Sequence, residues 1–176
     1  MTKQSHFFMF DDHSRSQSRQ LHMTPTKETI LILDKENHNR WILKVVLENE
    51  KYVVIAVDTM KRALENFSEF EVSGFITNYR VDQFCTLDVV RELKKKFPEA
   101  YVMMFSDEEI REKEYEEIMK AGVDDYFRKP FSMQKVLLHL KKGLKQRDIT
   151  LQKSRLEEEL SCIKTGRNIL ETFSKT

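Results

Sequence analysis

Four groups of polar and charged residues stand directly after short apolar runs, where a sheet would present functional side chains. They are Asp34-Lys35-Glu36, Asn78-Tyr79-Arg80, Ser106-Asp107 and Arg128-Lys129-Pro130. The carboxylates in these groups could bind a hard cation, and the ammonium groups could bind an anion. Because ligands of open parallel sheets bind at the carboxyl ends of the strands, these residues are the candidate site.

Other kinds of chemistry are excluded by motifs that the sequence lacks. Neither GxGxxG nor GxxxxGK[ST] is present, so the chain has no glycine-rich phosphate cradle. There is no GxSxG elbow, and none of the five histidines follows an apolar run as a general base would. Cys85 and Cys162 form no CxxC pair, which excludes a cysteine zinc site and a disulfide framework. We therefore expect no enzyme activity, no metal and no cofactor.

Residues 29–147 must supply the elements that position the candidate site. Five short apolar runs alternate there with longer amphipathic segments, and unbroken apolar runs are typical of strands covered on both faces. This alternation predicts an α/β fold, a five-stranded parallel sheet with helices on both faces. The expected strands are residues 30–33, 52–57, 74–77, 101–105 and 125–127.

The amphipathic segments predict where helices begin and which faces they bury. In the first helix, residues 41, 42, 45 and 46 form the expected buried stripe, which places Trp41 in the core. Thr59 is expected to precede the second helix, Asp107 to start the fourth, and Pro130 to stand just ahead of the fifth.

Composition divides the chain into three parts. Residues 1–28 carry too little patterned apolar surface to offset the entropy of folding, so we expect a disordered tail. Residues 29–147 form the predicted domain. Residues 148–176 lack any strand pattern and are expected to form a C-terminal helical extension.

The extension contains apolar residues at intervals of seven, which predicts a coiled coil continuous with the fifth helix. These residues are Ile149, Leu156, Ile163 and Leu170. At the complementary positions only Leu160 is apolar, so the seam is weak. Alternatively, the stripe packs back onto its own domain. Gly143 and Gly166 weaken the helix prediction, since each costs about 1 kcal/mol relative to alanine.

The charge balance limits the class of partner. Lys and Arg total 30 and Asp and Glu total 29, which argues against non-specific nucleic-acid binding. The apolar runs are far shorter than the roughly 20 residues of a membrane span, so we expect a cytoplasmic protein with protein partners. The acidic segment 107–120 and the basic segment 135–147 would suit contact across a two-fold dimer.

The strand ends resemble the receiver domain of two-component response regulators over about residues 29–147. The segment 30–37 is similar to the first strand and acidic pair of that family, and 76–80 is similar to the strand with the phosphoacceptor aspartate. The run 121–131 is the most specific, because Gly, an aromatic residue, Lys and Pro fall at the family spacing. The resemblance implies a flavodoxin-like, CheY-like receiver fold. It also implies that the site is lined by Ser106, the switch hydroxyl, and by Asp107, Tyr126, Lys129 and Pro130.

The sequence departs from the family where the resemblance implies phosphorylation. The phosphoacceptor position is Asn78, and an amide cannot form an acyl phosphate as a carboxylate does. The acidic-pair positions are Asp34 and Lys35, so the second member of the pair is a lysine. The resemblance assigns Mg²⁺ to carboxylates at positions 35 and 78, and both are absent. A lone Asp34 beside an ammonium group is a poor site for a hard dication. The charges of Asp34, Asp107, Lys35 and Lys129 could instead pair without a metal, unless Lys35 points to solvent.

These observations favour a pseudo-receiver, a phosphorylation-independent module that acts through protein contacts or as a homodimer. Its final helix would transmit a signal to an output domain or partner. One alternative is an active receiver that takes phosphate at Asp34 or Asp82. Another is that the chain is the N-terminal regulatory part of a longer transcription regulator or signalling enzyme.

Overall fold

The computed structural model describes residues 27–173, with side chains described as far as Thr165. Its centre is a five-stranded sheet in the order β2-β1-β3-β6-β7, in which all neighbouring strands are parallel. The strands are β1 (Thr29–Leu33), β2 (Val53–Val57), β3 (Gly74–Asn78), β6 (Tyr101–Ser106) and β7 (Asp125–Arg128). The predicted fold class is confirmed. The predicted tail falls on residues that lie, up to residue 26, outside the described part of the chain.

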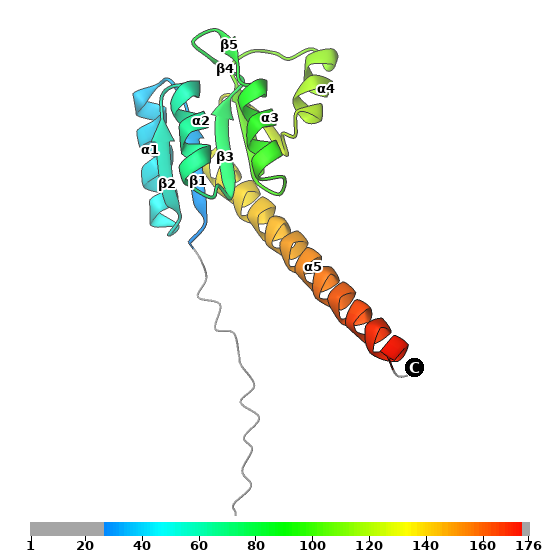
Figure 1. Cartoon of the computed structure of the whole chain (residues 1–176). Coiled ribbons are helices and arrows are strands. Elements are labelled where there is room, and N and C mark those ends of the chain that lie inside the picture. The colour runs from blue at the N-terminus through cyan, green and yellow to red at the C-terminus, as the bar shows by residue number, and fades with distance from the viewer. Residues whose placement is uncertain (1–26, 174–176) are drawn as a thin grey trace, which may run out of the picture.

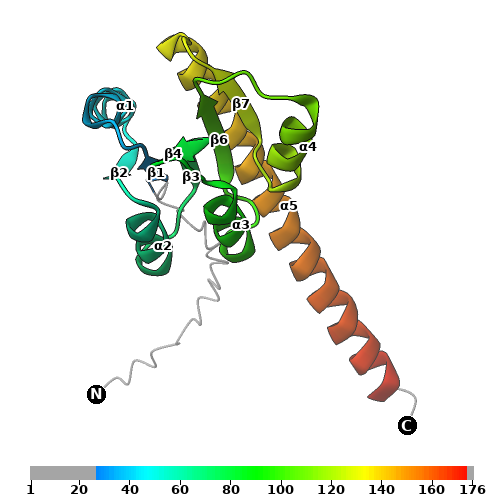
Figure 2. The same cartoon turned by 90° about the horizontal axis from the view of Figure 1, so that it is seen from above.

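Helices cover both faces of the sheet, as Figures 1 and 2 show. One face packs against α1 (Asn37–Asn49) and the first part of α5 (Met133–Phe173). The other packs against α2 (Met60–Glu69), α3 (Leu87–Lys96) and α4 (Glu112–Lys120). Strands covered on both faces explain why the apolar runs are unbroken rather than alternating.

Two helix starts test the sequence prediction. Thr59 caps α2 as predicted, since its hydroxyl oxygen accepts a hydrogen bond from the backbone N–H of Arg62 at 3.4 Å. The predicted start of the fourth helix at Asp107 is wrong, because α4 begins at Glu112. The carboxylate of Glu114 accepts the backbone N–H of Arg111 at 3.1 Å, which fixes the later start.

The prediction that Trp41 lies in the core is also wrong. The side chains of α1 that reach the core are Leu43 and Leu47, whereas Trp41 is 61 % exposed and Val45 lies beside it on the outer face. Leu43 and Leu47 have the i, i+4 spacing of one helix face, and so do Trp41 and Val45. Periodicity alone therefore could not show which of the two faces is buried.

The long helix α5 has two differently packed parts. Val136, Leu140 and Leu144 are buried against the sheet, and Gly143 allows close approach, because a Cβ there would lie 2.2 Å from the Tyr101 ring. Beyond Leu151 the described side chains are exposed, and the helix extends away from the domain (Figure 1). Within residues 27–173, neither α5 nor any other helix combines the length and apolar character needed to cross a membrane.

Candidate functional site

The predicted site residues lie together at the carboxyl edge of the sheet. Asp34 follows β1, Asn78 ends β3, Ser106 ends β6 and Lys129 follows β7. In the sheet register Asn78 is paired with Phe105, and Ser106 with Arg128. Parallel strands therefore bring the four positions to one edge, as the sequence predicts.

Asp34 is almost fully buried, with 3 % of its surface exposed. Its Oδ1 accepts the backbone N–H of Glu36 at 2.8 Å, which turns the chain from β1 toward α1. The guanidinium of Arg40 donates to the backbone carbonyls of Asp34 and Lys35 at 2.6 and 2.7 Å. The loop after β1 is therefore held by two polar side chains, of which Arg40 was not identified from the sequence.

Lys35 is paired with Asp82 and not with Asp34. Its side chain is 64 % exposed, and its ammonium group lies 2.5 Å from the carboxylate of Asp82. The hydrogen bond to Asp82, followed by the charge of that carboxylate, raises the pKa of Lys35. The family resemblance implies a metal-binding carboxylate at position 35. The structure has a lysine there, and its charge is paired with Asp82 on the surface.

Asp82 stands in a hairpin that the sequence did not predict. Two short antiparallel strands, β4 (Arg80–Val81) and β5 (Phe84–Cys85), are joined by Asp82 and Gln83. Both turn residues have positive φ, 51° and 68°, as a two-residue hairpin turn requires. The only local signal was an aspartate at the turn, because Gln83 is not a usual residue for this conformation.

Asn78 is held through its backbone. Its carbonyl accepts hydrogen bonds from the hydroxyls of Thr86 at 2.7 Å and Thr77 at 3.1 Å. The side-chain Oδ1 of Asn78 is buried and has no hydrogen-bond partner among the described residues. A neutral amide tolerates this surrounding better than a carboxylate would, since an unpaired buried charge is far more costly.

On the other side of the site, Ser106 is buried and its oxygen accepts the backbone N–H of Glu108 at 3.0 Å. The backbone N–H of Lys129 donates to the Ser106 carbonyl at 2.8 Å. The ammonium group of Lys129 lies 3.3 Å from the carboxylate of Asp107, and the Tyr126 hydroxyl donates to the Glu108 carbonyl at 3.4 Å. The loop after β6 is thus joined to β7 at several points.

The four predicted charges do not form one cluster. Lys35 pairs with Asp82 and Lys129 pairs with Asp107, whereas Asp34 is in neither pair. No group of three or more His, Cys, Asp or Glu residues within 27–173 is arranged to hold a metal ion. With one buried carboxylate, an amide and a cation at the relevant positions, the residues do not fit Mg²⁺.

A second polar cluster lies at the opposite, amino edge of the sheet. The Tyr101 hydroxyl donates to the carboxylate of Asp125, and Nδ1 of His139 lies 3.2 Å from the same carboxylate. Burial, followed by the hydrogen bond to Asp125, raises the pKa of Tyr101. Because His139 belongs to α5, this cluster attaches that helix to the sheet.

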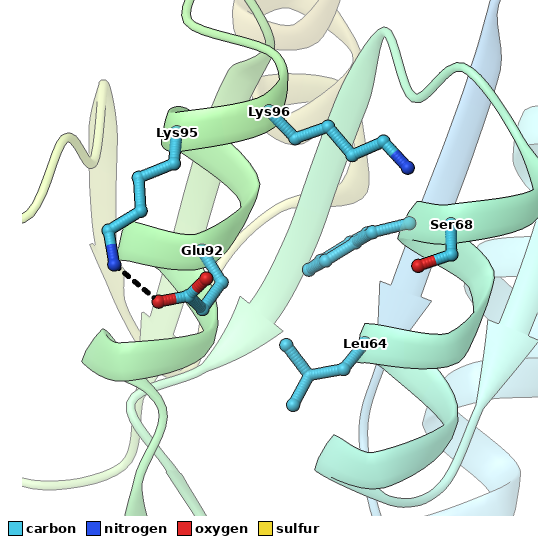
Figure 3. A pocket seen from close by; sticks show the side chains of 6 residues that line it. Leu64, Ser68, Glu92, Lys95 and Lys96 are labelled. Atoms are coloured by element: carbon cyan, nitrogen blue, oxygen red, sulfur yellow. Dashed lines mark hydrogen bonds and ion pairs between the residues drawn. The ribbon is translucent and has the colours of Figure 1, made fainter.

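The surface of the domain has a hollow beside the site and another between α2 and α3. The first, of about 280 Å³, is lined by Asp34, Asn39 and Lys129 together with apolar residues of α1, of β6 and of the segment around the start of α5. The other, of about 460 Å³, lies between α2 and α3, where Lys95 pairs with Glu92 at 2.6 Å (Figure 3). The second hollow contains none of the strand-end residues, so it belongs to a different part of the surface.

Comparison with known proteins identifies similar sequences. Residues 30–141 match the family described as the response regulator receiver domain. The transcriptional regulatory protein ResD of Bacillus subtilis (strain 168) is 28% identical over 125 residues, covering 70% of this chain and 51% of that protein. The two-component response regulator ORR7 of Oryza sativa subsp. japonica is 29% identical over 104 residues, covering 57% of this chain and 49% of that protein. The chain thus spans about half the length of these curated relatives.

Solved structures are similar in fold. A receiver domain protein (CheY-like) from Methanospirillum hungatei JF-1 matches with a TM-score of 0.67 at 19% identity, covering 71% of this chain and 99% of that one. A receiver domain protein from Clostridium thermocellum matches with a TM-score of 0.62 at 23% identity, covering 70% and 98%. At these identities the likeness describes the arrangement of the backbone.

Proposed function

This chain belongs to the response regulator receiver family of two-component signal transduction, and on that premise we propose that it signals without being phosphorylated. The observation that carries the proposal is Asn78 at the end of β3, where the family resemblance implies the phosphoacceptor aspartate. An amide oxygen does not form the acyl phosphate that a carboxylate forms. The domain would then act as a binding module rather than as an enzyme.

The surroundings of Asn78 support this proposal. Lys35 stands where the resemblance implies a second metal-binding carboxylate, and it is paired with Asp82. Lys129 is likewise paired with Asp107, so neither cation needs a phosphoryl group to balance it. Both cations of the site are balanced by ion pairs within the domain, whereas the buried Asp34 carboxylate is in neither pair.

The test is phosphorylation of the full chain with a small phosphodonor and Mg²⁺, followed by intact mass measurement. We expect no gain of a phosphoryl mass, and no rise in melting temperature with millimolar Mg²⁺. A gain that maps to Asp34 or Asp82 would instead support the alternative of an active receiver. Asp34 is nearly buried and Asp82 is bound to Lys35, so neither is well placed to attack a donor.

We also propose that the protein dimerises through the outer part of α5. Ile149, Leu156, Leu160 and Ile163 are between 49 % and 61 % exposed, and all four lie on the predicted seam. The exposure of these side chains and the way α5 extends away from the domain (Figure 1) support a seam between two copies rather than packing back onto the domain. A second copy of the helix would cover the same stripe along its length.

Analytical ultracentrifugation of full-length variants tests the dimer. Leu156→Asp with Ile163→Asp places charges in the seam and should yield monomers with an unchanged domain melting temperature. The matched control, Ser154→Asp with Ser161→Asp, adds the same charges to the same helix outside the seam and should remain dimeric. A wild-type monomer at high micromolar concentration would contradict the proposal. A seam variant that stays dimeric, with a salt-sensitive affinity, would favour contact between segments 107–120 and 135–147.

A second candidate function follows from the length of the relatives. The chain covers about half of ResD, which is named a transcriptional regulatory protein. We propose that the chain is the regulatory part of such an assembly, with α5 leading to an output domain or a separate cytoplasmic protein partner. Nearly balanced charge supports a protein rather than a nucleic acid as the surface that this segment contacts.

A further inference from the structure

The hollow beside Asp34 has the composition of a small-molecule site. It has a volume of about 280 Å³ and lies between α1 and the segment that joins β7 to α5. Its polar wall includes Asp34, Asn39 and Lys129, and its apolar wall includes Ile42, Leu43, Phe131 and Met133. Concave sites with mainly apolar walls and a few placed charges are typical of ligand pockets.

The polar wall carries one charge of each sign. Asp34 is 3 % exposed, and no hydrogen bond joins its Oδ2 to a described residue, since Glu36 donates to Oδ1. The Lys129 side chain is 22 % exposed, and its ammonium contact at 3.3 Å is to Asp107, which is 75 % exposed. An exposed pair of this kind contributes little, so an incoming carboxylate could replace Asp107 at small cost.

The apolar wall is firmly built. Phe131 stacks on the buried ring of Phe105 with centroids 4.2 Å apart, and Leu43 is itself buried in the core. These side chains can cover a short aliphatic or aromatic group, but they offer no polar partner to it. Besides the two charges the lining has one polar side chain, Asn39, which is too few for the several polar groups of a sugar or a nucleotide, so the hollow favours an apolar body.

We propose that this hollow binds a free α-amino acid with an apolar side chain. The α-ammonium group would donate to Asp34, the α-carboxylate would accept from Lys129, and the side chain would lie on the apolar wall. A ligand with only one charge would either leave Oδ2 of Asp34 without a partner or leave Lys129 on its exposed pair with Asp107, and it would make one charge-assisted contact in place of two. An amphoteric ligand satisfies both charges at once.

Such a ligand would connect the two sides of the strand-end site. Lys129 is joined through its backbone N–H to Ser106, and its side chain would exchange Asp107 for the ligand carboxylate. Binding would thereby shift the loop that follows β6, residues 107–111, which leads into α4. This inference rests on the proposed function, to which it adds the chemical class of the input.

Calorimetry and thermal melting of the full chain test the proposal, with L-leucine, L-methionine and L-phenylalanine as probes. We expect saturable binding and a rise in melting temperature with at least one of them. The matched probes are 3-methylbutylamine, which lacks the carboxylate of leucine, and 4-methylpentanoate, which lacks its ammonium group. Both should bind about tenfold more weakly or not at all, because each loses a charge-assisted hydrogen bond.

Two variants locate the binding. Asp34→Asn and Lys129→Gln should each weaken the amino acid by about tenfold or more, whereas Asp88→Asn, an exposed change on α3, should have no effect. If Asp34→Asn fails to fold, Lys129→Gln still decides the matter, because Lys129 is partly exposed.

Three outcomes would overturn the proposal: no saturable binding of any amino acid, equal binding of the amine or acid alone, or binding that survives both variants. A phosphoryl gain in the mass measurement would overturn the proposed function instead. That result would leave the binding data unaffected, so the two failures are distinguishable.

Discussion

The two sides of the strand-end site differ in how far they keep the pattern of the family. On the β6–β7 side, Ser106, Tyr126 and Lys129 stand at the positions that the resemblance implies, and hydrogen bonds join the loop after β6 to β7. On the β1–β3 side, Lys35 and Asn78 replace the two carboxylates that would contact Mg²⁺. The residues that the resemblance links to Mg²⁺ and phosphorylation are thus changed on one side, while the switch residues of the family pattern stand unchanged on the other.

The two residues that depart from the family pattern on the β1–β3 side add no unpaired charge to the site. Lys35 is paired with Asp82 of the β4–β5 hairpin, and the Asn78 side chain, whose Oδ1 is buried, is neutral. A simple loss of function would not require either feature. We therefore expect the β1–β3 side to need no metal, and the following experiments test that expectation.

The largest effect should come from restoring both carboxylates with Lys35→Asp and Asn78→Asp. The double variant should bind Mg²⁺ and gain about 2.7 kcal/mol in unfolding free energy when Mg²⁺ is at 100 times its Kd. Denaturant unfolding with and without Mg²⁺ measures the gain, and the wild type should show none. The matched control is Lys35→Asn with Asn78→Asp, which removes the cation but adds only one carboxylate. If this control responds equally, the second carboxylate is not needed.

The next effect concerns Thr86, which is fully buried and donates to the Asn78 carbonyl at 2.7 Å. Thr86→Val keeps the shape of the side chain and removes the hydroxyl, so we expect a loss of about 1–2 kcal/mol in unfolding free energy. Urea denaturation measures the loss, with Thr150→Val on the outer surface of α5 as the control. No loss would mean that Thr77, which also donates to this carbonyl, holds Asn78 alone.

A smaller effect is expected on the β6–β7 side from Ser106→Ala. This change removes the acceptor for the Glu108 backbone N–H but leaves that N–H close to solvent, so we expect a loss of about 0.5–1.5 kcal/mol. Urea denaturation alongside the Thr86 variant compares the two sides directly. A loss larger than that of Thr86→Val would reverse the order and show that the β6–β7 side is the more strongly held.

The smallest effect should come from Lys35→Gln, because the Lys35–Asp82 pair is exposed. The melting temperature should change little at neutral pH and less still at high salt. Since the pair raises the pKa of Lys35, its small contribution is present at neutral pH and is lost as the pH rises through that raised pKa. A large loss on substitution would show that the pair positions the hairpin rather than only compensating charge.

Much of the fold and the identity of the site residues could be predicted from the sequence. The unbroken apolar runs predicted all five strands of the main sheet, because a strand covered on both faces needs apolar side chains on both. Since parallel strands end at one edge, the residues after each run had to lie close together. The amide at position 78 and the cation at position 35 are properties of the sequence alone.

The partners of those residues were decided only by the tertiary structure. A lysine side chain is long and flexible, so the spacing of residues could not show that Lys35 reaches Asp82 rather than Asp34. The exposure of Trp41 depended on which of two equally periodic faces of α1 met the sheet. The hollow between Asp34 and Lys129 exists because α1 and the segment after β7, far apart in the sequence, pack side by side. Residue types and periodicity carry local information, whereas these contacts depend on long-range packing.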